Sequence, residues 1–406
     1  MQILTFTSLF PNAVRPIQGI FVYQRVAHLE GRLGNQVTVI APVPYFPAWL
    51  KIARWHSMSQ VPREERAGAL AVYHPRYFLL PKVSMPLHGV LMFLGSARLV
   101  RRLKRRLNFD CIDAHFVFPD GFAAVLLGKL LRIPVVVSAR GTDINLYSSF
   151  LLICPMIRWT LRNAAGVIAV SEALRDEMVK LGLPREKIRV VGNGVDLERF
   201  KPVDRCEARR QLGLSEDGQL IVSVGAMIPS KGHHLLIRAF REVAARYPGL
   251  ALYIVGEGAS RRELETLVGE TDLQERVHVV GARPNEELYL WFSAADVSCL
   301  ASSREGWPNV VLESLACGTP VVATPVGGVP EILVSPDLGV LVGPDVQALV
   351  AGLELALRKN WDRAALVRYA QKRTWEIVAA EVEDYLRSRT SQVRRAPADA
   401  NSQAGP

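Results

Sequence analysis

Short apolar runs alternate along the chain with longer segments in which apolar residues recur every three or four positions. The short runs predict buried strands, and the longer segments predict amphipathic helices. Strands that alternate with helices indicate a parallel sheet covered by helices. In the first half, strands are expected at 2–8, 36–41, 70–73, 111–114, 134–139, 166–170 and 188–191, and helices at 19–33, at 121–131 and after the capping residue Ser171.

The same pattern starts again after a polar stretch, which predicts a linker between two domains. Strands of the second half are expected at 220–225, 251–256, 277–281, 297–300, 320–323 and 339–342. The predicted divisions are a first domain at 1–200, a linker at 201–218, a second domain at 219–362, a helical region at 363–388 and a disordered tail at 389–406. Doubly wound sheets bind ligands at the carboxyl ends of their strands, so we expect two α/β domains that face each other across a ligand cleft.

Composition agrees with two domains, because 406 residues with 49% hydrophobic residues suffice for two cores. The five cysteines are scattered and odd in number, which indicates reduced thiols in a cytoplasmic protein. The chain starts without the basic segment of a signal peptide, so we expect a first strand there. No apolar stretch reaches about 18 residues, and we therefore expect no membrane-spanning helix.

A net charge of +10 predicts an acidic partner, either substrate phosphates or an anionic membrane surface. The segment 87–107 places an apolar half before a run of cations, which is typical of a basic amphipathic helix at a bilayer interface. These cations are Arg98, Arg101, Arg102, Lys104, Arg105 and Arg106. A loop expected at 45–55 adds aromatic residues and further cations. The alternative is an ordinary core-facing helix and a packed loop, and nucleic acid is disfavoured because no nucleic-acid-binding module is recognisable.

The segment 305–331, EGWPNVVLESLACGTPVVATPVGGVPE, combines two carboxylates with a helix start. Pro308 suits the first turn of a helix at 309–317, and the unpaired amides at 309–311 suit a diphosphate. Glu313 lies four residues after Asn309 on the same helical face, where its carboxylate can accept hydrogen bonds from a pair of hydroxyls such as those of a ribose. Glu305 would reach the far end of the same ligand. The alternative is that both residues are solvated charges beside an ordinary strand and helix.

This segment resembles the E-x7-E signature of retaining glycosyltransferases of family 4, which have the GT-B fold. The opening LTFTSLFPNAVRPIQGIF at 4–21 is similar to that of a subgroup from bacterial surface-polysaccharide pathways, including teichuronic-acid-type glycosyltransferases. The resemblance implies that Glu305 contacts the transferred sugar and Glu313 the nucleotide ribose. It also implies that the region 363–388 crosses back to the first domain. The implied donor contacts in the segment further include Gly306, Trp307, Pro308, Asn309 and Val310.

A second loop, at 224–232, follows a strand and precedes a helix, so Lys231 can approach a phosphate. The family commonly has an arginine after the first glycine of this loop, where the chain has Ala226. In the first domain Arg140 stands where the family commonly has the histidine of His-Gly-x-Asp. We therefore hypothesise that Arg140 supplies the missing charge, although it could instead form a surface ion pair with Asp143. Lysine alone binds a phosphate as a point charge and not bidentately.

Three further residues are candidates for the site. His115 ends a strand just before Asp120, which suits contact with the acceptor, although a histidine there is more often structural. Gly19 would let backbone approach the donor phosphates. The resemblance adds Gly256, near the nucleotide base, and suggests a conformational role for the turn at 193–196.

The absence of several metal-binding and nucleotide-binding motifs disfavours some classes of enzyme. No Asp-x-Asp occurs and no histidine or cysteine cluster has metal-ligand spacing, so we expect no metal and no cofactor. The first β–α loop lacks G-x-G-x-x-G, and the chain has no G-x-x-x-x-G-K-[ST], which disfavours dinucleotide oxidoreductases, kinases and ATPases.

The sequence thus predicts a metal-independent retaining glycosyltransferase. A nucleotide-diphosphate sugar would bind the second domain and a lipid-linked or polysaccharide acceptor the first, at the inner face of the cytoplasmic membrane. Two alternatives remain open: a catalytically silent sugar-nucleotide-binding scaffold with this fold, and an enzyme of another reaction, such as an inverting transferase, an epimerase or a phosphorylase.

Overall fold

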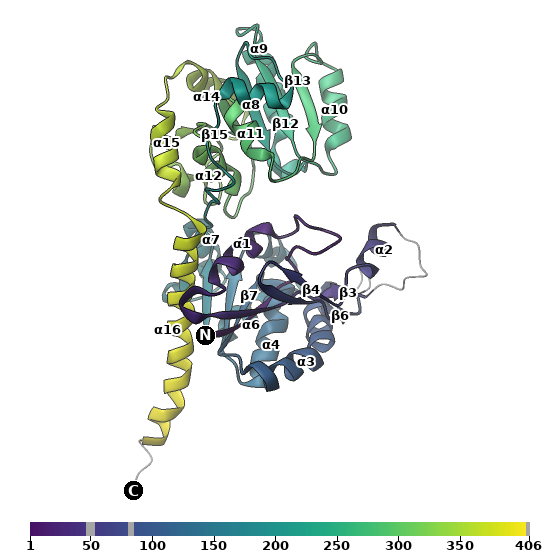
Figure 1. Ribbon diagram of the computed structural model, residues 1–406, viewed down its shortest axis with the longest axis vertical. Coiled ribbons are helices and arrows are strands. Elements are labelled where there is room, and N and C mark those ends of the chain that lie inside the picture. Colours follow the sequence, from purple (N-terminus) through teal and green to yellow (C-terminus); the bar gives the residue numbers. More distant parts are fainter. Residues whose placement is uncertain (46–52, 80–84, 403–406) are drawn as a thin grey trace. The chain divides into compact units, whose positions relative to one another are not determined.

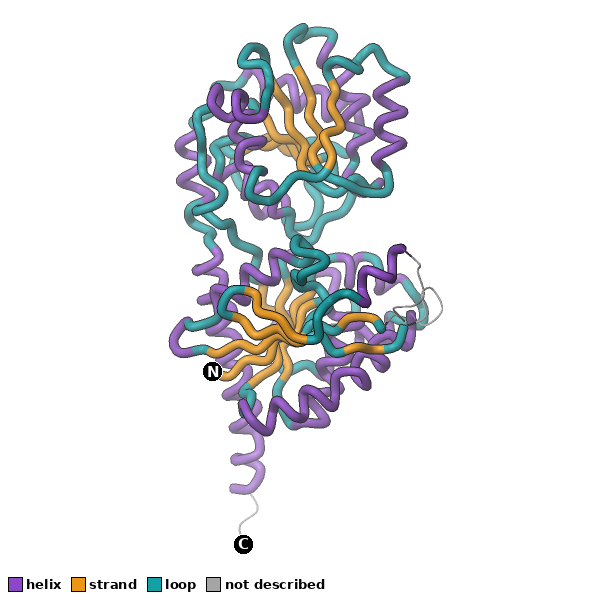
Figure 2. Tube along the Cα trace, turned by 45° about the vertical axis from the view of Figure 1, so that its right-hand side comes forward, coloured by secondary structure: helices purple, strands orange, loops and turns teal. Residues whose placement is uncertain are grey.

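The computed structural model describes residues 1–45, 53–79 and 85–402, and the chain divides into two compact units (Figure 1). Unit 1 contains Met1–Asn193 and Trp375–Pro406, and unit 2 contains Gly194–Thr374. In each unit helices pack around a central sheet (Figure 2). The loop expected at 45–55 lies mostly outside the described residues.

Unit 1 is built on an eight-stranded sheet of order β10-β9-β8-β7-β1-β2-β5-β4. Its pairings are parallel apart from β4 with β5, and β3 pairs separately with β6. The strands are β1 Gln2–Phe6, β2 Gln36–Ile40, β3 Val43–Pro44, β4 Glu64–Ala67, β5 Leu70–Tyr73, β6 Arg76–Tyr77, β7 Cys111–His115, β8 Val135–Ala139, β9 Gly166–Ala169 and β10 Ile188–Val190. The strands predicted for this half are confirmed to within two residues, because parallel strands covered on both faces are continuous apolar runs.

Helices surround this sheet in unit 1 (Figure 2). They are α1 Ile20–Leu29, α2 Ala53–Ser59, α3 His88–Leu107, α4 Phe122–Leu131, α5 Thr142–Asn145, α6 Cys154–Asn163, α7 Glu172–Lys180 and α16 Trp375–Ser402, with 3-10 turns at Arg32–Gly34, Met85–Leu87, Tyr147–Ser149 and Arg185–Lys187 and a π turn at Val117–Gly121. Ser171 caps α7 as predicted, since its hydroxyl accepts the Leu174 N–H at 3.2 Å. The helix predicted at 19–33 ends earlier, at Leu29, because Glu30 is extended and Gly31 has a φ of 75°.

Helix α16 lies beside α1 within unit 1 (Figure 1). Trp375, Val378 and Val382 from α16 share one buried apolar cluster with Val22 and Val26 from α1. The helix continues to Ser402, so the disordered tail predicted from residue 389 is helical as far as that residue. Each residue that extends an existing helix adds one hydrogen bond. A prediction from composition alone does not include this contribution.

Helix α3 confirms the amphipathic helix predicted at 87–107. Its buried side packs on unit 1 through residues such as Met92, Val100 and Leu103, as an ordinary core-facing helix would. Its exposed side carries five arginines that form no ion pair within the described residues: Arg98, Arg101, Arg102, Arg105 and Arg106. The sixth cation, Lys104, donates instead to the carbonyl of Leu131. In the described part of the chain, no helix is both long enough and apolar enough to cross a membrane.

Unit 2 contains a parallel six-stranded sheet of order β13-β12-β11-β14-β15-β16. Its strands are β11 Leu220–Val224, β12 Ala251–Val255, β13 Val277–Gly281, β14 Val297–Leu300, β15 Val321–Ala323 and β16 Gly339–Leu341. Its helices are α8 Arg205–Leu212, α9 His233–Ala244, α10 Arg261–Gly269, α11 Leu288–Ala294, α12 Asn309–Ala316, α13 Val329–Ile332, α14 Val346–Arg358 and α15 Arg363–Ala370, with a 3-10 turn at Pro229–Lys231. Two apolar clusters join the sheet to its helices, one with α9, α10 and α14 and the other with α11, α12 and α15.

The linker predicted at 201–218 is folded into unit 2, where it forms α8. Asp204 caps this helix by accepting the Glu207 N–H at 3.0 Å, and Gly213 follows its last residue with a φ of 68°. Arg209 is almost fully buried, and its guanidinium binds the Asp296 carboxylate at 2.9 Å and the Ala294 carbonyl at 3.0 Å. The sequence of this segment is typical of a linker because the larger of its two buried residues, Ala208 and Arg209, is charged.

Candidate functional site

Three loops of unit 2 meet at the carboxyl ends of neighbouring strands. They follow β11, β14 and β15, which are adjacent in the sheet, at 225–232, 301–308 and 324–328. Backbone hydrogen bonds join them: Ser303 donates to the Ser230 carbonyl at 2.8 Å, and Gly328 donates to the Gly306 carbonyl at 3.0 Å. The predicted site segments are therefore brought together, as expected for the ligand-binding edge of a doubly wound sheet.

Two glycines allow these loops to pack so closely. Gly232 has a φ of 69°, and a Cβ added to it would lie 1.9 Å from the carbonyl oxygen of Ala301. Gly327 has a φ of 55°, and its added Cβ would lie 2.2 Å from the carbonyl oxygen of Glu305. A side chain at either position would meet both backbone strain and a clash with fixed backbone.

Lys231 and Glu305 form an ion pair, with 2.6 Å between Nζ and Oε1. Ser302 donates its hydroxyl to the same carboxylate oxygen at 2.7 Å. The side chains of Lys231 and Glu305 are 21% and 9% exposed, so solvent screens the pair less than it would screen a surface pair. The sequence predicted both residues for the site, but the ion pair between them and the contribution of Ser302 are revealed only by the structure.

Helix α12 begins at Asn309, directly after Pro308 as the sequence predicted. The expectation that the amides at 309–311 are all available needs a correction, because the Val311 N–H donates to the Pro308 carbonyl at 3.1 Å. The first turn thus closes on itself. Within the described residues the Val310 N–H makes no such bond, so this amide and the partial positive charge of the helix start remain for an anion.

Glu313 lies one turn further along α12 and is half-buried. In the described part of the chain its carboxylate makes no hydrogen bond and no ion pair. Burial raises its pKa from 4.5 to about 7, with Arg199 opposing the rise and Asp196 adding to it. A buried carboxylate without hydrogen-bond donors is destabilising unless a ligand supplies them. The hydroxyl pair of a ribose would supply two.

In unit 1, Arg140 and His115 lie at the ends of the neighbouring strands β8 and β7. Arg140 hydrogen-bonds to His115 Nδ1 through its Nη2 and to Asn193 Oδ1 at 3.1 Å through its Nη1. Its guanidinium also lies over the ring of Phe21, 5.3 Å from the ring centroid. The predicted alternative, a surface ion pair with Asp143, is wrong: the Asp143 carboxylate accepts backbone amides, including that of Arg140 at 3.1 Å.

His115 itself is fully buried, and both of its ring nitrogens lie within hydrogen-bond distance of protein groups. Burial and the neighbouring Arg25 lower its pKa to about 3, so the ring is neutral. In this structure His115 is not open to an acceptor, contrary to the prediction. The sequence reasoning also missed Arg25 and Asp113, whose only visible signal was the Asp-x-His spacing at the end of β7.

The remaining predicted glycines act through close packing. Gly19 precedes α1 with a φ of 66°, and an added Cβ would lie 2.3 Å from the Leu9 carbonyl oxygen. Gly256 follows β12, and its added Cβ would lie 1.8 Å from the Gly225 carbonyl oxygen. Gly256 therefore positions the loop that carries Lys231. In unit 1, burial raises the pKa of Asp120 to about 7, although this carboxylate accepts the Ser8 N–H.

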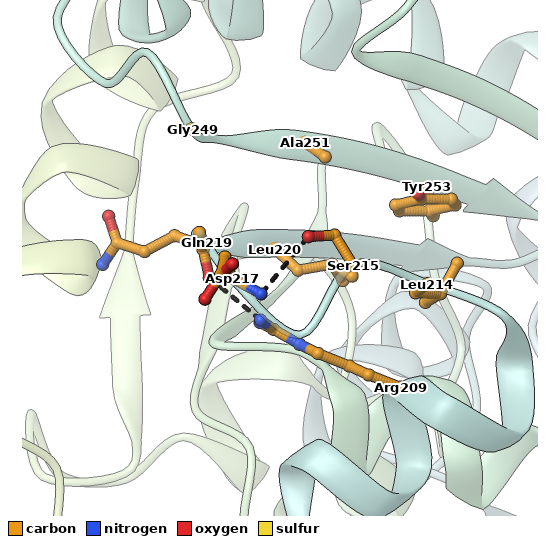
Figure 3. Close-up of a pocket in the computed structure, with 10 residues that line it drawn as sticks. Arg209, Leu214, Ser215, Asp217, Gln219, Leu220, Gly249, Ala251 and Tyr253 are labelled. Atoms are coloured by element: carbon orange, nitrogen blue, oxygen red, sulfur yellow. Dashed lines mark hydrogen bonds between the residues drawn. The ribbon is translucent and has the colours of Figure 1, made fainter.

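A separate cavity of about 250 Å³ is lined by the residues that lead into β11 and β12 (Figure 3). It therefore lies at the amino ends of these strands, away from the predicted site. Arg209 lines it, but this guanidinium donates to the carbonyls of Glu216 and Gly218 at 2.9 Å each and binds Asp296. Because its charged group is already satisfied, this cavity is not a competing site for an anionic ligand.

Comparison with known proteins gives the family. The Glycosyltransferase Family 4 model matches residues 18–199, and the model of Glycosyl transferases group 1 matches residues 204–373. The putative teichuronic acid biosynthesis glycosyltransferase TuaC of Bacillus subtilis (strain 168) is 29% identical over 390 residues, which cover 94% of this chain and 92% of TuaC. MJ1607 of Methanocaldococcus jannaschii, an uncharacterized glycosyltransferase, is 30% identical over 280 residues, which cover 66% of this chain and 71% of MJ1607.

Among solved structures, Anabaena Alr3699/HepE in complex with UDP and glucose has a TM-score of 0.71 at 19% identity, covering 95% of this chain and 99% of that protein. This likeness concerns the fold alone. The Family 4 model covers most of the part of unit 1 before residue 194, and the group 1 model covers most of unit 2. The sheets of both units are doubly wound. The chain therefore belongs to the family 4 glycosyltransferases and is an enzyme with the GT-B fold.

Proposed function

We propose that the enzyme is a retaining glycosyltransferase that takes its sugar from a nucleotide-diphosphate donor held by unit 2. The observation that carries this proposal is the half-buried Glu313 carboxylate, which receives no hydrogen bond from the described residues and lies one turn from the start of α12. A ribose at Glu313 would place the diphosphate near the Val310 amide and Lys231. The transferred sugar would then lie beside Glu305, and Gly306, Trp307 and Pro308 would line the donor between these groups.

The Lys231–Glu305 ion pair suggests how donor binding prepares the site. A diphosphate carries more charge than one carboxylate, so it would compete for the Lys231 ammonium. Glu305 would then be released to accept hydrogen bonds from hydroxyls of the sugar. The ion pair would thus keep both side chains in place before the donor arrives.

The resemblance to retaining enzymes supports front-face attack by the acceptor hydroxyl. Its oxygen forms a bond to the anomeric carbon while the bond from that carbon to the phosphate oxygen breaks, and the hydroxyl proton passes to the leaving phosphate. Anomeric configuration is kept and no protein nucleophile is required. Lys231 and the start of α12 would stabilise the negative charge that develops on the diphosphate.

We propose that this reaction needs no metal ion, in line with the missing Asp-x-Asp in the sequence.

We assign the acceptor to unit 1 and expect a lipid-linked saccharide or a growing surface polysaccharide, as the name of the similar TuaC suggests. The exposed arginines of α3 would hold the enzyme at the anionic inner face of the cytoplasmic membrane.

Thermal unfolding of the full-length protein tests the donor site. UDP, GDP, ADP, CMP and the matching sugar nucleotides are compared with and without EDTA, for the wild type and Glu313→Ala. A ligand at about 100 times its Kd adds about 2.7 kcal/mol of stability, which raises the midpoint clearly. We expect one nucleotide to stabilise the wild type more than the variant, with EDTA making no difference. No shift with any of them would contradict the donor site, and an inverted product anomer in an NMR assay would contradict retention.

A further inference from the structure

Four polar side chains of unit 1 form a buried cluster at the ends of β7 and β8. Arg25, from α1, binds the Asp113 carboxylate through Nη2 at 2.7 and 2.8 Å. The Asp113 Oδ2 lies 3.1 Å from Nε2 of His115, whose Nδ1 faces Arg140. Arg25, Asp113 and His115 are at most 2% exposed, so protein groups alone set their hydrogen bonding. The cluster thus forms a chain from Arg25 through Asp113 and His115 to Arg140.

Hydrogen-bond chemistry fixes where the His115 proton lies. A guanidinium has only donors, so His115 Nδ1 must be the acceptor for Arg140. In a neutral ring the other nitrogen then carries the hydrogen, and Nε2–H donates to the ionised Asp113 carboxylate. The opposite tautomer would set an Nδ1–H against the N–H of Arg140. The Nη2 of Arg25 also lies 3.0 Å from Nε2, but if Nε2 accepted from it, Nδ1 would carry the hydrogen and face the N–H of Arg140. The Asp113 oxygens, 2.7 to 3.1 Å away, can accept from both Nη2 and Nε2.

Among the described residues the Arg140 guanidinium forms no ion pair, although the Asp113 and Asp143 carboxylates act on it through space. Its hydrogen-bond partners, His115 and Asn193, are neutral, and Phe21 offers only a ring face. Its Nε atom is buried and makes no hydrogen bond in the described part of the chain. The nearest acid in sequence, Asp143, is occupied by backbone amides. A guanidinium in such surroundings favours the arrival of an anion.

We propose that Arg140 binds a phosphate group of a substrate, and that Asp113, itself held by Arg25, positions Arg140 by fixing the Nε2–H tautomer of His115. We call this arrangement the relay. In the relay, Asp113 and His115 touch no substrate and act only through Arg140. The phosphate assignment rests on the proposed function, because a nucleotide-diphosphate donor or a phosphorylated acceptor would supply that group. The tautomer follows from the geometry alone.

Nitrogen-15 NMR of the histidine side chains in the full-length protein tests the tautomer directly. The His115 signals are assigned by their loss in His115→Asn. We expect an unprotonated Nδ1 and a protonated Nε2 in the wild type, unchanged between pH 5 and pH 8. Asp113→Asn offers an amide N–H to Nε2 and should reverse the tautomer. A protonated Nδ1 in the wild type would overturn the relay, whether or not any nucleotide binds.

Binding of UDP, measured by calorimetry, tests the positioning role. If Arg140 binds the donor phosphate, Arg140→Ala, Asp113→Asn and His115→Phe should each weaken UDP binding by roughly tenfold or more, as expected when a charge-assisted hydrogen bond is lost. If it binds an acceptor phosphate, the same losses should appear in the binding of inorganic phosphate instead. His115→Asn keeps an acceptor oxygen near the Nδ1 position and should stay within about threefold of the wild type. The double variant Arg140→Ala/Asp113→Asn should bind as weakly as Arg140→Ala alone, because Asp113 acts through Arg140. Additive losses would overturn the relay.

A matched control separates positioning from general stability. Ser138→Ala removes the 3.0 Å hydrogen bond to Arg25 Nη1 but leaves the bonds of His115 intact. It should lower the unfolding midpoint without changing UDP affinity. If Ser138→Ala weakens UDP as much as Asp113→Asn does, the effect of Asp113 is structural and the relay is wrong.

Inorganic phosphate, followed by broadening of its phosphorus-31 signal, identifies the source of the phosphate. If Arg140 binds the donor diphosphate, saturating UDP should displace inorganic phosphate from the wild type. If it binds a phosphorylated acceptor, phosphate should remain bound in the presence of UDP and be lost in Arg140→Ala. Should Arg140→Ala change the binding of neither UDP nor phosphate, the anion site is refuted. A wild type that binds phosphate but no nucleotide would contradict the proposed donor and leave Arg140 as an acceptor site.

Discussion

Replacing Glu313 with glutamine should stabilise the ligand-free protein while weakening its affinity for nucleotide. Glutamine has nearly the same shape as glutamate but cannot ionise. In the folded protein, burial raises the pKa of Glu313 from 4.5 to about 7. An acid with a raised pKa contributes full stability below its unfolded value, and that contribution falls as the pH rises toward its folded value. The wild type should therefore lose stability between these two pH values, and Glu313→Gln should not.

The size of this effect follows from the two pKa values. At about 1.4 kcal/mol for each pKa unit, integration from pH 5 to pH 8 gives a loss of about 2.5 kcal/mol for the wild type. Urea unfolding of both proteins at both pH values measures it as the difference between wild type and variant. Other titrating groups, such as Asp120 in unit 1, cancel in this difference. A difference that stays constant to within about 0.5 kcal/mol would refute the argument that Glu313 is a half-buried carboxylate without a hydrogen-bond donor among the described residues.

Ionised Glu313 should favour nucleotide binding, although it destabilises the ligand-free protein. If ribose hydroxyls donate to Glu313, the bound state favours the ionised carboxylate, and wild-type affinity should rise with pH relative to that of Glu313→Gln. At pH 8 the variant should bind about 1 to 3 kcal/mol more weakly, the range for hydrogen bonds to a charged group. Ionisation of the nucleotide phosphate affects both proteins equally. Equal affinities at pH 8 would refute the ribose assignment and leave the stability argument standing.

Three further predictions follow from the loops of unit 2 and from α3. Glu305→Gln should leave UDP affinity unchanged in calorimetry but slow transfer from the sugar nucleotide, and equal losses in both assays would count against a sugar contact. Gly232→Ala should destabilise unit 2 by more than about 2 kcal/mol in urea, whereas Gly269→Ala, with nothing within 4 Å of the added Cβ, should be neutral or stabilising. Arg101→Glu with Arg105→Glu should reduce binding to anionic vesicles by at least about thirtyfold without changing UDP affinity, and unchanged vesicle binding would exclude α3 as the membrane contact.

The sheets could be predicted from the sequence because most of their strands are buried on both faces. The strand at 297–300 is an example, since all of its residues are buried and its predicted and observed bounds agree. The strands that escaped prediction carry no such signal: β3 and β6 have two residues each, and β4 is an edge strand with a polar sequence. Segment 201–218 was misjudged for a related reason, because Arg209 is buried with its charge satisfied and composition cannot distinguish that from a solvated arginine.

The carboxylates of unit 2 were predictable because their geometry is local. A proline at a helix start and a glutamate one turn later define their relative positions within a single segment. The ion pair between Lys231 and Glu305 joins residues 74 positions apart in the sequence. The two residues meet because β11 and β14, which precede them, are neighbours in the sheet. Sequence reasoning could assign each residue to the donor, but it could not show that the two bind each other before the donor arrives.

The environment of Arg140 in unit 1 was harder to predict from sequence, because it depends on residues from three elements. Arg25 is 88 positions from Asp113, and His115 is 25 positions from Arg140. From sequence, the arginine in the place of the family histidine is a candidate for supplying charge to a phosphate. The structure adds a physical reason for it to do so: a neutral histidine and an asparagine hold the guanidinium, which forms no ion pair with any described residue. Such a group is destabilising in the ligand-free protein. Replacing Arg140 with methionine should therefore raise the stability of unit 1 while weakening phosphate binding, and a loss of stability would mean that Arg140 is held for packing alone.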